Sequence, residues 1–398
     1  MILPMADLPP SSFKRPGPPP LWTSETLFLD GDEYFDGMLA DVRQANRLIT
    51  VEMYIFEWDV LGQKLFQEFE AAANRGVEVR LLVDAVGSHA FIQRLQLENY
   101  HANIKVKVFN PHPWTFSYRR WYNLFLTLKI FFTRLMWINR RNHRKIITID
   151  EKIVWIGSFN VSADHLRTVH NDMAWRDAGL RLTGWIAPLF VLSLMKSWGV
   201  RDFFRYMKRM PKKKFIRFKH PDVRLNHGFR LRRLLYRDFM ERVKGAKHRI
   251  WLRPGYFLPK RRLVKLLARA AKRGVDVRVL ISTKSDVFYY GLLQTSHDPY
   301  LVKNGVKIFH YLPTITHAKN YFIDDWVTVG STNLNHRSFM HDLEVDVRVQ
   351  HPDNRRLLSE SFESMTLDAT EVTMELLKAR PWYERLATRL IFIFRYWN

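Results

Sequence analysis

The pattern His-x-Lys-x4-Asp occurs twice in this chain, and each copy is followed at nearly the same distance by Gly-Ser-x-Asn. The repeated residues are His143, Lys145, Asp150, Ser158 and Asn160 in the first copy and His317, Lys319, Asp324, Ser331 and Asn333 in the second. A histidine can attack or protonate, and a fixed lysine can neutralise negative charge as it develops. Two histidines and two lysines from a duplicated frame are what metal-free phosphodiester chemistry requires. A doubled triplet with a matched sequel is hard to obtain by chance.

Each motif is predicted to lie on a β-hairpin. In the first copy, the apolar runs 146–149 and 153–156 flank a short polar turn. Antiparallel pairing about that turn is expected to bring Ser158 opposite His143. The second hairpin, shorter by one residue, is expected to bring its Gly-Ser serine opposite its histidine in the same way.

Within each motif, the histidine and the lysine should project together, because residues i and i+2 of a strand face the same side. The aspartate comes five residues after the lysine and falls out of phase. Asp150 and Asp324 are therefore expected to brace the hairpin or a neighbouring cation rather than touch a substrate. A Gly-Ser turn offers backbone N–H groups and a hydroxyl to an anion, and an asparagine can donate to the same phosphate. The predicted phosphate ligands are Ser158, Asn160, Ser331 and Asn333.

A second repeat indicates an α/β fold. Residues 72–80 are echoed by residues 270–278, and both stretches are typical of a helix that ends at glycine before a β-branched strand. An apolar run precedes each helix, at 48–56 and at 250–257. Each half is therefore predicted to contain strand, helix and strand, and the two halves are copies.

Composition bounds the size of the core and the kind of partner. The 398 residues are 47% hydrophobic, which is enough to bury a sizeable core in two domains. The formal net charge of +24 indicates an anionic partner, either nucleic acid or an acidic lipid surface. The chain has no cysteine, which excludes disulfides, thiolate nucleophiles and cysteine-ligated zinc. We see no convincing cluster of metal ligands and expect no metal or cofactor.

Three segments combine aromatic and basic residues. The insert 117–140 holds the 24 extra residues that precede the first motif, and its apolar side chains follow helical spacing between arginines. We interpret it as an amphipathic helix in a membrane interface, with a helix packed on the domain's own core as the alternative. Residues 203–220 carry eight Lys or Arg and no acid, either as a solvated linker or as a lipid-facing stretch. Residues 382–397 place aromatic anchors beside arginines, which suits a headgroup region.

The chain resembles the phospholipase D superfamily, and within it the bacterial cardiolipin synthases of the short form without transmembrane helices. The resemblance covers most of residues 26–370 and includes the acidic-aromatic strand 51–56 and the stretch 329–338. Asn335 departs from the aspartate commonly found at that position. The resemblance implies an α/β fold of two homologous phospholipase D-type domains, each a mixed β-sheet flanked by helices. A pseudo-twofold axis would relate the domains, with the active site between them.

Domain boundaries follow from the same resemblance and from the composition. We expect a disordered lead-in at 1–25, the two domains at 26–202 and 225–370, a basic linker at 203–224 and a C-terminal amphipathic segment at 371–398.

The resemblance implies a two-step reaction through a phosphatidyl-histidine. One histidine attacks the phosphodiester, and the other protonates the departing alcohol and then activates the acceptor alcohol. Lys145 and Lys319 would neutralise the non-bridging oxygens. Family analogy favours His143 as the nucleophile over His317.

Two later carboxylates match the family's positions for acids that hold the second nitrogen of each histidine. Asp177 lies 34 residues after His143, and Glu344 lies 27 residues after His317. The alternative is that both are surface charges on the next strand. The other histidines near the motifs are interpreted as bystanders; they are His165, His170, His336 and His341.

The activity implied is that of a cardiolipin synthase, which transfers a phosphatidyl group from phosphatidylglycerol to the headgroup hydroxyl of another phospholipid. A phospholipid hydrolase, a metal-independent nuclease and a non-catalytic membrane tether are the alternatives. The interfacial segments disfavour nucleic acid as partner. We expect a peripheral enzyme on an anionic bilayer, at the cytoplasmic face of the bacterial inner membrane. An oligomer is not required, because one chain supplies both motifs.

Overall fold

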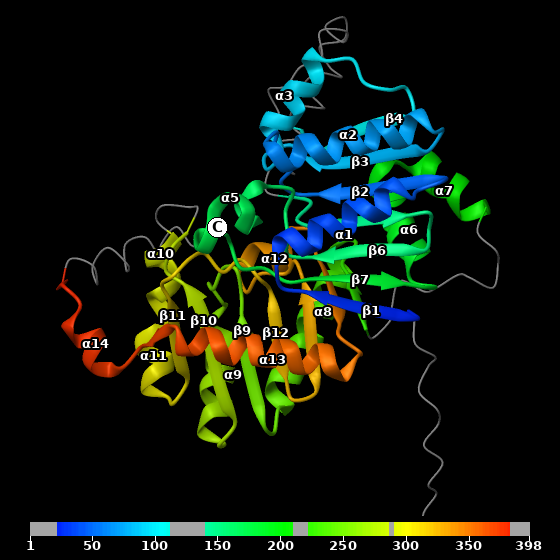
Figure 1. Cartoon of the computed structure of the whole chain (residues 1–398). Coiled ribbons are helices and arrows are strands. Elements are labelled where there is room, and N and C mark those ends of the chain that lie inside the picture. The colour runs from blue at the N-terminus through cyan, green and yellow to red at the C-terminus, as the bar shows by residue number, and fades with distance from the viewer. Residues whose placement is uncertain (1–21, 112–139, 210–221, 286–289, 383–398) are drawn as a thin grey trace, which may run out of the picture.

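The computed structural model describes residues 22–111, 140–209, 222–285 and 290–382. Two mixed β-sheets pack against each other, and helices cover their outer faces (Figure 1). This arrangement confirms the predicted α/β fold with one mixed sheet in each half.

The first half forms a seven-stranded sheet. Its strands are β1 (Ser24–Phe28), β2 (Leu48–Met53), β3 (Glu78–Asp84), β4 (Ile104–Phe109), β5 (Ile146–Ile149), β6 (Ile153–Gly157) and β7 (Gly179–Thr183). The spatial order is β1-β7-β6-β5-β2-β3-β4. Strands β2, β3 and β4 are parallel, whereas β5 pairs antiparallel with both β2 and β6.

The second half repeats this topology in an eight-stranded sheet. Its strands are β8 (Val223–Leu225), β9 (Arg249–Arg253), β10 (Asp276–Ser282), β11 (Lys307–Tyr311), β12 (Asn320–Ile323), β13 (Trp326–Gly330), β14 (Val345–Arg348) and β15 (Ala369–Glu371). The order is β15-β11-β10-β9-β12-β13-β14-β8. The run β11-β10-β9-β12-β13-β14 matches β4-β3-β2-β5-β6-β7 strand for strand. The duplication seen in the sequence is therefore a duplication of topology.

Helices link the strands and pack on both the outer and the inner faces of the sheets. In the first half they are α1 (Gly31–Arg43), α2 (Val60–Asn74), α3 (His89–Leu97), the 3-10 helix η2 (Ala163–His165), α5 (Arg167–His170), η3 (Asn171–Met173), α6 (Ala187–Trp198) and α7 (Val200–Arg209). In the second half they are α8 (Phe229–Gly245), α9 (Arg261–Lys272), α10 (Tyr290–Leu293), η5 (Gln294–His297), α11 (Asp298–Lys303), α12 (His336–Met340), α13 (Pro352–Leu367) and α14 (Met374–Ala379).

The repeated helix-to-strand connections have the predicted form. Helix α2 leads into β3 through Gly76 at φ 93°, and α9 leads into β10 through Gly274 at φ 87°. Only glycine takes this left-handed conformation without steric cost, which explains why both copies end the helix with the same residue.

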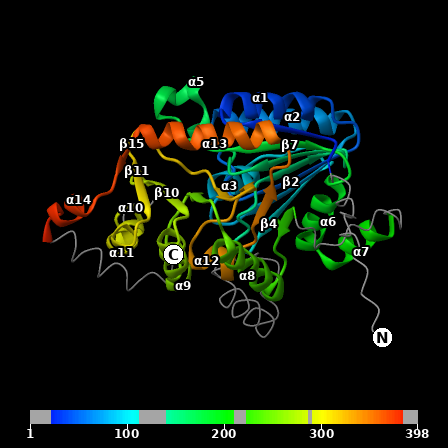
Figure 2. The same ribbon diagram turned by 90° about the horizontal axis from the view of Figure 1, so that it is seen from below.

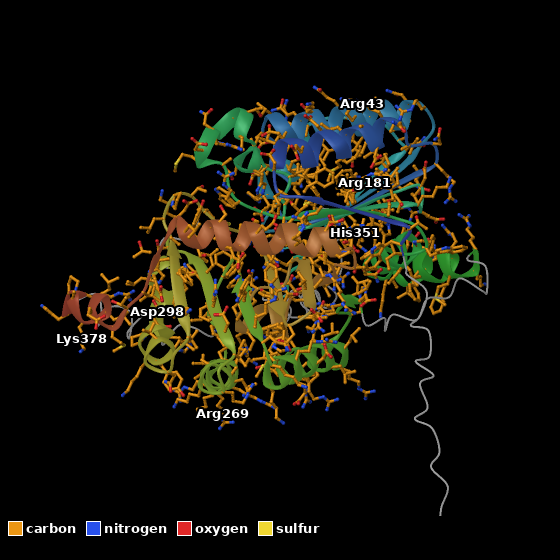
Figure 3. All side chains as sticks on the ribbon, turned by 60° about the horizontal axis from the view of Figure 1, so that its bottom comes forward. Arg43, Arg181, Arg269, Asp298, His351 and Lys378 are labelled. Atoms are coloured by element: carbon orange, nitrogen blue, oxygen red, sulfur yellow. The ribbon has the colours of Figure 1, made fainter. Side chains whose placement is uncertain are left out.

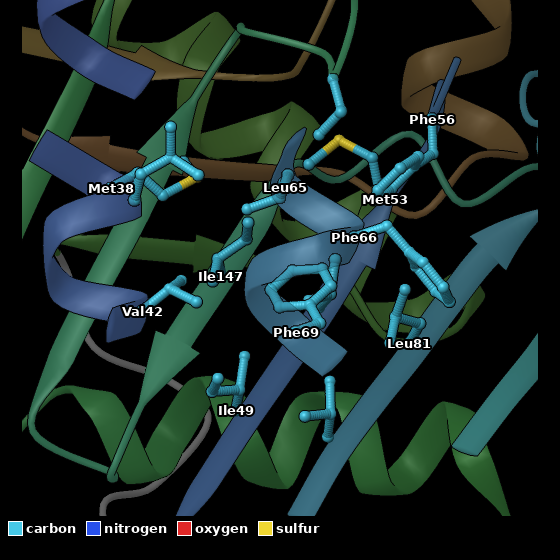
Figure 4. Packing of buried hydrophobic residues seen from close by; sticks show 14 of the residues in the cluster. Met38, Val42, Ile49, Met53, Phe56, Leu65, Phe66, Phe69, Leu81 and Ile147 are labelled. Atoms are coloured by element: carbon cyan, nitrogen blue, oxygen red, sulfur yellow. The ribbon is translucent and has the colours of Figure 1, made fainter. Parts of the chain in front are cut away.

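Three apolar layers hold the molecule together. The outer layer of the first half lies between α1, α2 and the sheet, where Phe69 packs near Ile147 (Figure 4). A second layer lies between the two sheets and joins Ile146 of the first half to Phe322 of the second. Neighbouring residues of β5 thus face different layers, and all four are buried, as expected for a strand covered on both faces. A third layer lies beneath α8 and α9.

The ends of the molecule correct the expected boundaries. Strand β1 begins at Ser24, and Trp22 is already buried, so the lead-in expected to be disordered at 1–25 folds with the first sheet at its end. Helix α7 occupies the start of the expected basic linker, and β8 pairs with β14 at the end of that linker. Helices α7 and α14 lie at opposite ends of the molecule (Figure 2).

The segments proposed to contact lipid lie largely outside the described residues. These are most of the insert 117–140, the linker residues 210–221 and the C-terminal residues 383–398. In the described part of the chain, no helix has both the length and the apolarity needed to span a bilayer. Charged side chains project outward from α1, α9 and α14, as Arg43, Arg269 and Lys378 illustrate (Figure 3).

Candidate active site

The two hairpins form as predicted, but their register differs by one residue. Ile146 lies opposite Ile156, which sets Ser158 level with Arg144 and not with His143. The first turn has three residues, two of them at positive φ, and is centred on Glu151 rather than between residues. The second hairpin pairs Asn320 with Val329, which displaces its serine by one residue as well.

The chain before each hairpin leaves its own sheet and pairs with the other half. Asn142 forms a parallel bridge with Leu343, and Arg176 forms one with Thr316. As a result, the backbone N–H of His143 donates to Leu343 O at 2.9 Å, and that of His317 donates to Arg176 O at 3.0 Å. Each histidine is thus fastened to the residue that precedes a carboxylate of the opposite half.

The two carboxylates are therefore exchanged between the halves. His143 Nδ1 lies 3.1 Å from Glu344 Oε2, and His317 Nδ1 lies 3.3 Å from Asp177 Oδ1. In the sequence, each carboxylate follows the histidine of its own half, and sequence distance contains no sign of the exchange. Asp177 and Glu344 are both buried and are not surface charges.

The protonation of His143 follows from its neighbours. Its Nδ1 also lies 3.0 Å from the carbonyl oxygen of Ser331, which can only accept. Nδ1 therefore carries the ring proton and donates it, while Nε2 keeps its lone pair. Burial, followed by the positive charges of Lys145 and Lys319, lowers the pKa of His143 well below its usual value. His143 is thus held as a neutral base.

All four histidines and lysines of the motifs belong to one site. Lys145 Nζ donates to His143 O at 2.8 Å, and Lys319 Nζ donates to His317 O. Burial, Lys319 and, in part, Lys145 lower the pKa of His317 to about 3, against the opposing effect of Asp177. Burial lowers the pKa of Lys145 to about 8.

The two carboxylates differ in charge. Burial alone would raise the pKa of Asp177, but His317 and His165 outweigh it and hold the pKa well below the usual value. Burial raises the pKa of Glu344 to about 7, with Lys145 opposing. Asp177 is consequently a permanent anion beside His317, whereas Glu344 titrates near neutrality beside His143.

The motif aspartates lie at the hairpin turns and contact none of the motif histidines and lysines. Asp150 accepts the backbone N–H groups of Asn46, Arg47 and Leu48 at 2.9, 2.8 and 3.0 Å. Asp324 accepts those of Lys247, His248 and Arg249 at 3.0, 2.8 and 3.1 Å. Both therefore anchor the loop that enters β2 or β9, and the structure places them outside the reacting centre.

The predicted phosphate ligands fall into two groups. Ser158 Oγ donates to Ala178 O at 3.2 Å, and the Ser331 hydroxyl donates to Glu344, so both serines support the strand that carries a carboxylate. Asn333 Oδ1 accepts the N–H of Tyr256 at 3.0 Å. Asn160 is buried, and neither atom of its amide has a hydrogen-bond partner among the described residues. A buried amide in this state is well suited to meet a ligand.

Sequence reasoning missed several neighbours of the histidines. The Tyr54 ring lies 4.7 Å from His143, and the Trp175 ring lies 5.7 Å from His317. The bridge from Phe56 to Val161 is repeated in the second half by the bridge from Phe257 to Leu334. Gly255 is therefore the counterpart of Tyr54, because each lies two residues before the bridged phenylalanine. A Cβ at Gly255 would lie 2.8 Å from Lys319 Nζ, which explains the glycine. Aligning the repeats through their hairpins would have revealed this pair.

Arg144 is a further buried residue near the site, and it occupies the variable position between the histidine and the lysine of the first motif. Its Nη1 lies 3.2 Å from Glu52 Oε2, and its Nη2 donates to Asn226 O at 2.7 Å. The equivalent residue of the second motif is Ala318. The ion pair therefore exists in the first half alone, and Arg144 Nε reaches the second half by donating to Glu344 O at 3.3 Å. In the described part of the chain, no three His, Asp or Glu side chains are grouped to hold a metal ion.

Known proteins resemble the chain in sequence and in fold. The family model described as cardiolipin synthase, phospholipase D-like domain, matches residues 38–179 and 239–366. A cardiolipin synthase from Staphylococcus aureus is 29% identical over 374 residues, which cover 89% of this chain and 68% of the relative. A probable cardiolipin synthase from Bacillus subtilis is 29% identical over 345 residues, which cover 84% of this chain and 64% of that protein. The crystal structure of phosphatidylserine synthase from Haemophilus influenzae shares the fold, with a TM-score of 0.65 at 13% identity over 93% of this chain and 92% of that one.

Proposed function

The chain belongs to the family of cardiolipin synthases with a phospholipase D-like domain, and from this premise we propose that it is a phosphatidyltransferase that makes cardiolipin. Phosphatidylglycerol would serve as donor and as acceptor. The observation that carries the proposal is the pairing of two buried histidines, each with a lysine of its own half and a carboxylate of the other. One phosphate between them would meet a nucleophile, an acid and two positive charges.

The first step of the proposed reaction uses His143 as nucleophile. Its Nε2 lone pair attacks phosphorus, the bond to the glycerol oxygen breaks, and His317 gives that oxygen its proton. Lys145 and Lys319 offset the charge on the non-bridging oxygens. Asn160 donates to one of them. In the second step, His317 takes the proton of the acceptor hydroxyl, the new phosphorus–oxygen bond forms, and the bond to His143 breaks.

The difference between the carboxylates supports this assignment. A histidine that acts as the general acid must first be an imidazolium, and the anion Asp177 that would stabilise it lies against His317. Burial and Lys319 depress the pKa of His317, and a substrate phosphate beside the lysines would offset the second of these causes. His143 needs only its neutral form, which Ser331 O and Glu344 hold.

We propose that the enzyme binds the surface of an anionic bilayer, at the cytoplasmic face of the bacterial inner membrane. Helix α7 supports this within the described residues. Val200 is 74% exposed and Phe204 is 54% exposed, and basic side chains surround them. These exposed basic residues are Arg201, Arg205, Lys208 and Arg209. Each well-placed basic residue contributes about 1 kcal/mol on an anionic membrane.

The direct test offers the purified protein phosphatidylglycerol vesicles and plasmid DNA in parallel. Two molecules of phosphatidylglycerol should yield one cardiolipin and one glycerol. Phosphatidic acid without cardiolipin would identify a hydrolase instead. Nicked DNA without any lipid product would identify a nuclease and overturn the proposal.

Membrane binding is tested separately by sedimentation with anionic and zwitterionic vesicles. Changing Arg201, Arg205 and Lys208 of α7 to glutamate should reduce pelleting with anionic vesicles. The matched control changes three exposed basic residues of α9, Arg262, Lys265 and Arg269, to glutamate. Equal losses of pelleting in both variants would mean that the net charge of the protein drives binding and that no particular face contacts the membrane. Removal of residues 383–398 is expected to weaken pelleting further.

A further inference from the structure

Each carboxylate of the site is supported from behind by one more side chain, and the two supports differ in chemistry. Both lie five residues after the asparagine of Gly-Ser-x-Asn: His165 follows Asn160, and Ser338 follows Asn333. The matched positions show that these residues are equivalents in the duplication. His165 is therefore not the bystander that the sequence suggested.

In the first half, the support is a buried histidine between a backbone N–H and a carboxylate. The N–H of Asn160 donates to His165 Nε2 at 3.1 Å, and His165 Nδ1 lies 3.0 Å from Asp177 Oδ2. The other oxygen of Asp177 faces His317. Since Nε2 accepts a hydrogen bond, the ring proton must be on Nδ1, the nitrogen that faces Asp177. His165 is thus fixed as a neutral ring with one orientation.

In the second half, a serine makes the same connection. The N–H of Asn333 donates to Ser338 Oγ at 3.3 Å, and the Ser338 side chain is one of the groups that lower the pKa of Glu344 against the effect of burial. Glu344 in turn faces His143. Both halves therefore link the backbone of a predicted phosphate ligand, through one side chain and one carboxylate, to the histidine of the opposite half.

The two links are built from side chains of different length. Asp177 is one methylene shorter than Glu344, and the imidazole of His165 is longer than the hydroxymethyl group of Ser338. The serines of the two Gly-Ser turns differ in the same way. Ser331 reaches the longer carboxylate, Glu344, whereas Ser158 does not contact Asp177 and bonds to the backbone of Ala178. The shorter carboxylate, Asp177, is thus supported by the longer side chain of His165, and the longer carboxylate, Glu344, by the shorter side chain of Ser338.

We propose that His165 is a positioning residue of the active site, which forms with Asp177 the long-support counterpart of the pair Ser338 and Glu344. Through this pair, the segment that holds Asn160 sets the position and charge of the carboxylate behind His317. The dependence of catalysis on His165 rests on the proposed function, whereas its contacts with Asn160 and Asp177 do not.

The surroundings of Asp177 determine what the loss of His165 would do. The charged and titratable groups that act on this carboxylate or feel it are His165, His317, Lys145, Arg253 and Tyr34. Without His165, one of the two contacts that lower the pKa of Asp177 is lost while the carboxylate stays buried. Its pKa then rises, so the negative charge that faces His317 is held less firmly as the pH falls.

The test exchanges the pairs between the halves. H165S and D177E should each lower kcat by roughly tenfold, because the histidine behind them shifts. The double variant H165S/D177E reproduces the pair of the second half and should recover kcat to within about threefold of the natural protein, as expected for residues that act as a unit. H165A/D177E has no hydroxyl and serves as the matched control that should not recover. S338H/E344D tests the reverse exchange at His143.

The outcomes distinguish positioning from simple support of the fold. H165S should add an acid limb to the pH dependence of kcat, which the double variant removes, while melting temperatures separate instability from misplacement. Single-variant losses that multiply in the double variant, or natural kcat and pH dependence in H165A, would overturn the proposal.

A spectroscopic measurement tests the geometry without any turnover. In protein labelled with 15N-histidine, the signals lost on H165S substitution belong to His165. They should show a neutral ring with the proton on Nδ1 at pH 7. A proton on Nε2 would contradict the link. If the natural protein makes no lipid product, the proposed function fails, and this spectrum still decides the placement of His165.

Discussion

The two halves share a strand order but surround their histidines differently. His143 has Tyr54 beside it and a carboxylate, Glu344, whose pKa is raised to about 7. His317 has Trp175 beside it and a carboxylate, Asp177, that stays ionised. The duplicated frame fixes where the groups lie, while substitutions within each copy give the two histidines different partners, as the proposed division into a nucleophile and a proton carrier requires.

The buried charged side chains next to the motifs differ between the halves as well. Glu52 and Arg144 form a buried ion pair in the first half. At the position of Glu52, the second half has Arg253, which donates to Asn320 and contacts no carboxylate among the described residues. Each motif therefore has a buried arginine nearby, but the two arginines stand at positions that are not equivalent in the duplication, and only Arg144 is paired with an acid.

The sharpest test of the comparison separates the two histidines by leaving group. H143A and H317A should each lower turnover of phosphatidylglycerol by at least roughly a hundredfold, the low end for loss of a proton-transfer group. With a phosphatidyl nitrophenol, whose leaving group needs no proton, the first step should recover in H317A but not in H143A. Release of nitrophenol in a rapid-mixing assay measures this step. Recovery in H143A alone would reverse the assignment.

The next largest effect concerns the buried ion pair. R144A should lower the free energy of unfolding by about 3–5 kcal/mol, because Glu52 is left charged and buried without its partner. Denaturant unfolding followed by fluorescence measures the change. The matched control is E52L/R144M, which removes both charges and should cost much less. Equal destabilisation in the single and double variants would show that the pair acts through packing alone.

Much of the fold and part of the site could be predicted from the sequence. The doubled motif, the glycine-ended helices and the apolar runs are local patterns, so strands β2, β5 and β6 and both hairpins were expected. The exchange of Asp177 and Glu344 was not, because it depends on the chain crossing between halves at Asn142 and Arg176. Such pairing leaves no periodic signal.

The register and His165 illustrate two further limits. The two turns have the expected lengths of three and two residues, but pairing about their centres places each serine opposite the residue that follows the histidine. His165 looked like one of several histidines near the motifs. Its equivalence to Ser338 becomes meaningful only when the structure shows that Asp177 lies between His165 and His317, as Glu344 lies between Ser338 and His143. Distances along the chain cannot supply that knowledge.

A medium-sized effect concerns pH. For kcat/KM, we expect a rise with pH through about 7, because Glu344 must lose its proton to provide the anion beside His143. A fall should follow through about 8, because Lys145 then loses its positive charge. Each limb should approach tenfold per pH unit in initial-rate measurements. E344Q should remove the acid limb, whereas D177N should lower the rate without moving either limb. An acid limb that persists in E344Q would contradict the asymmetry.

The smallest effect is expected where the halves are most alike. Asp150 and Asp324 each accept three backbone N–H groups at equivalent turns, so D150A and D324A should each reduce stability by about 1 kcal/mol, as does the loss of a capping side chain. Because neither aspartate contacts the motif histidines or lysines, kcat should stay within a few fold of the natural value at a temperature where the variants are folded. Thermal melts and initial rates measure both quantities on the same samples. A hundredfold loss of kcat at an unchanged melting temperature would return these aspartates to the reacting centre, and unequal losses of stability would show that even this part of the duplication has diverged.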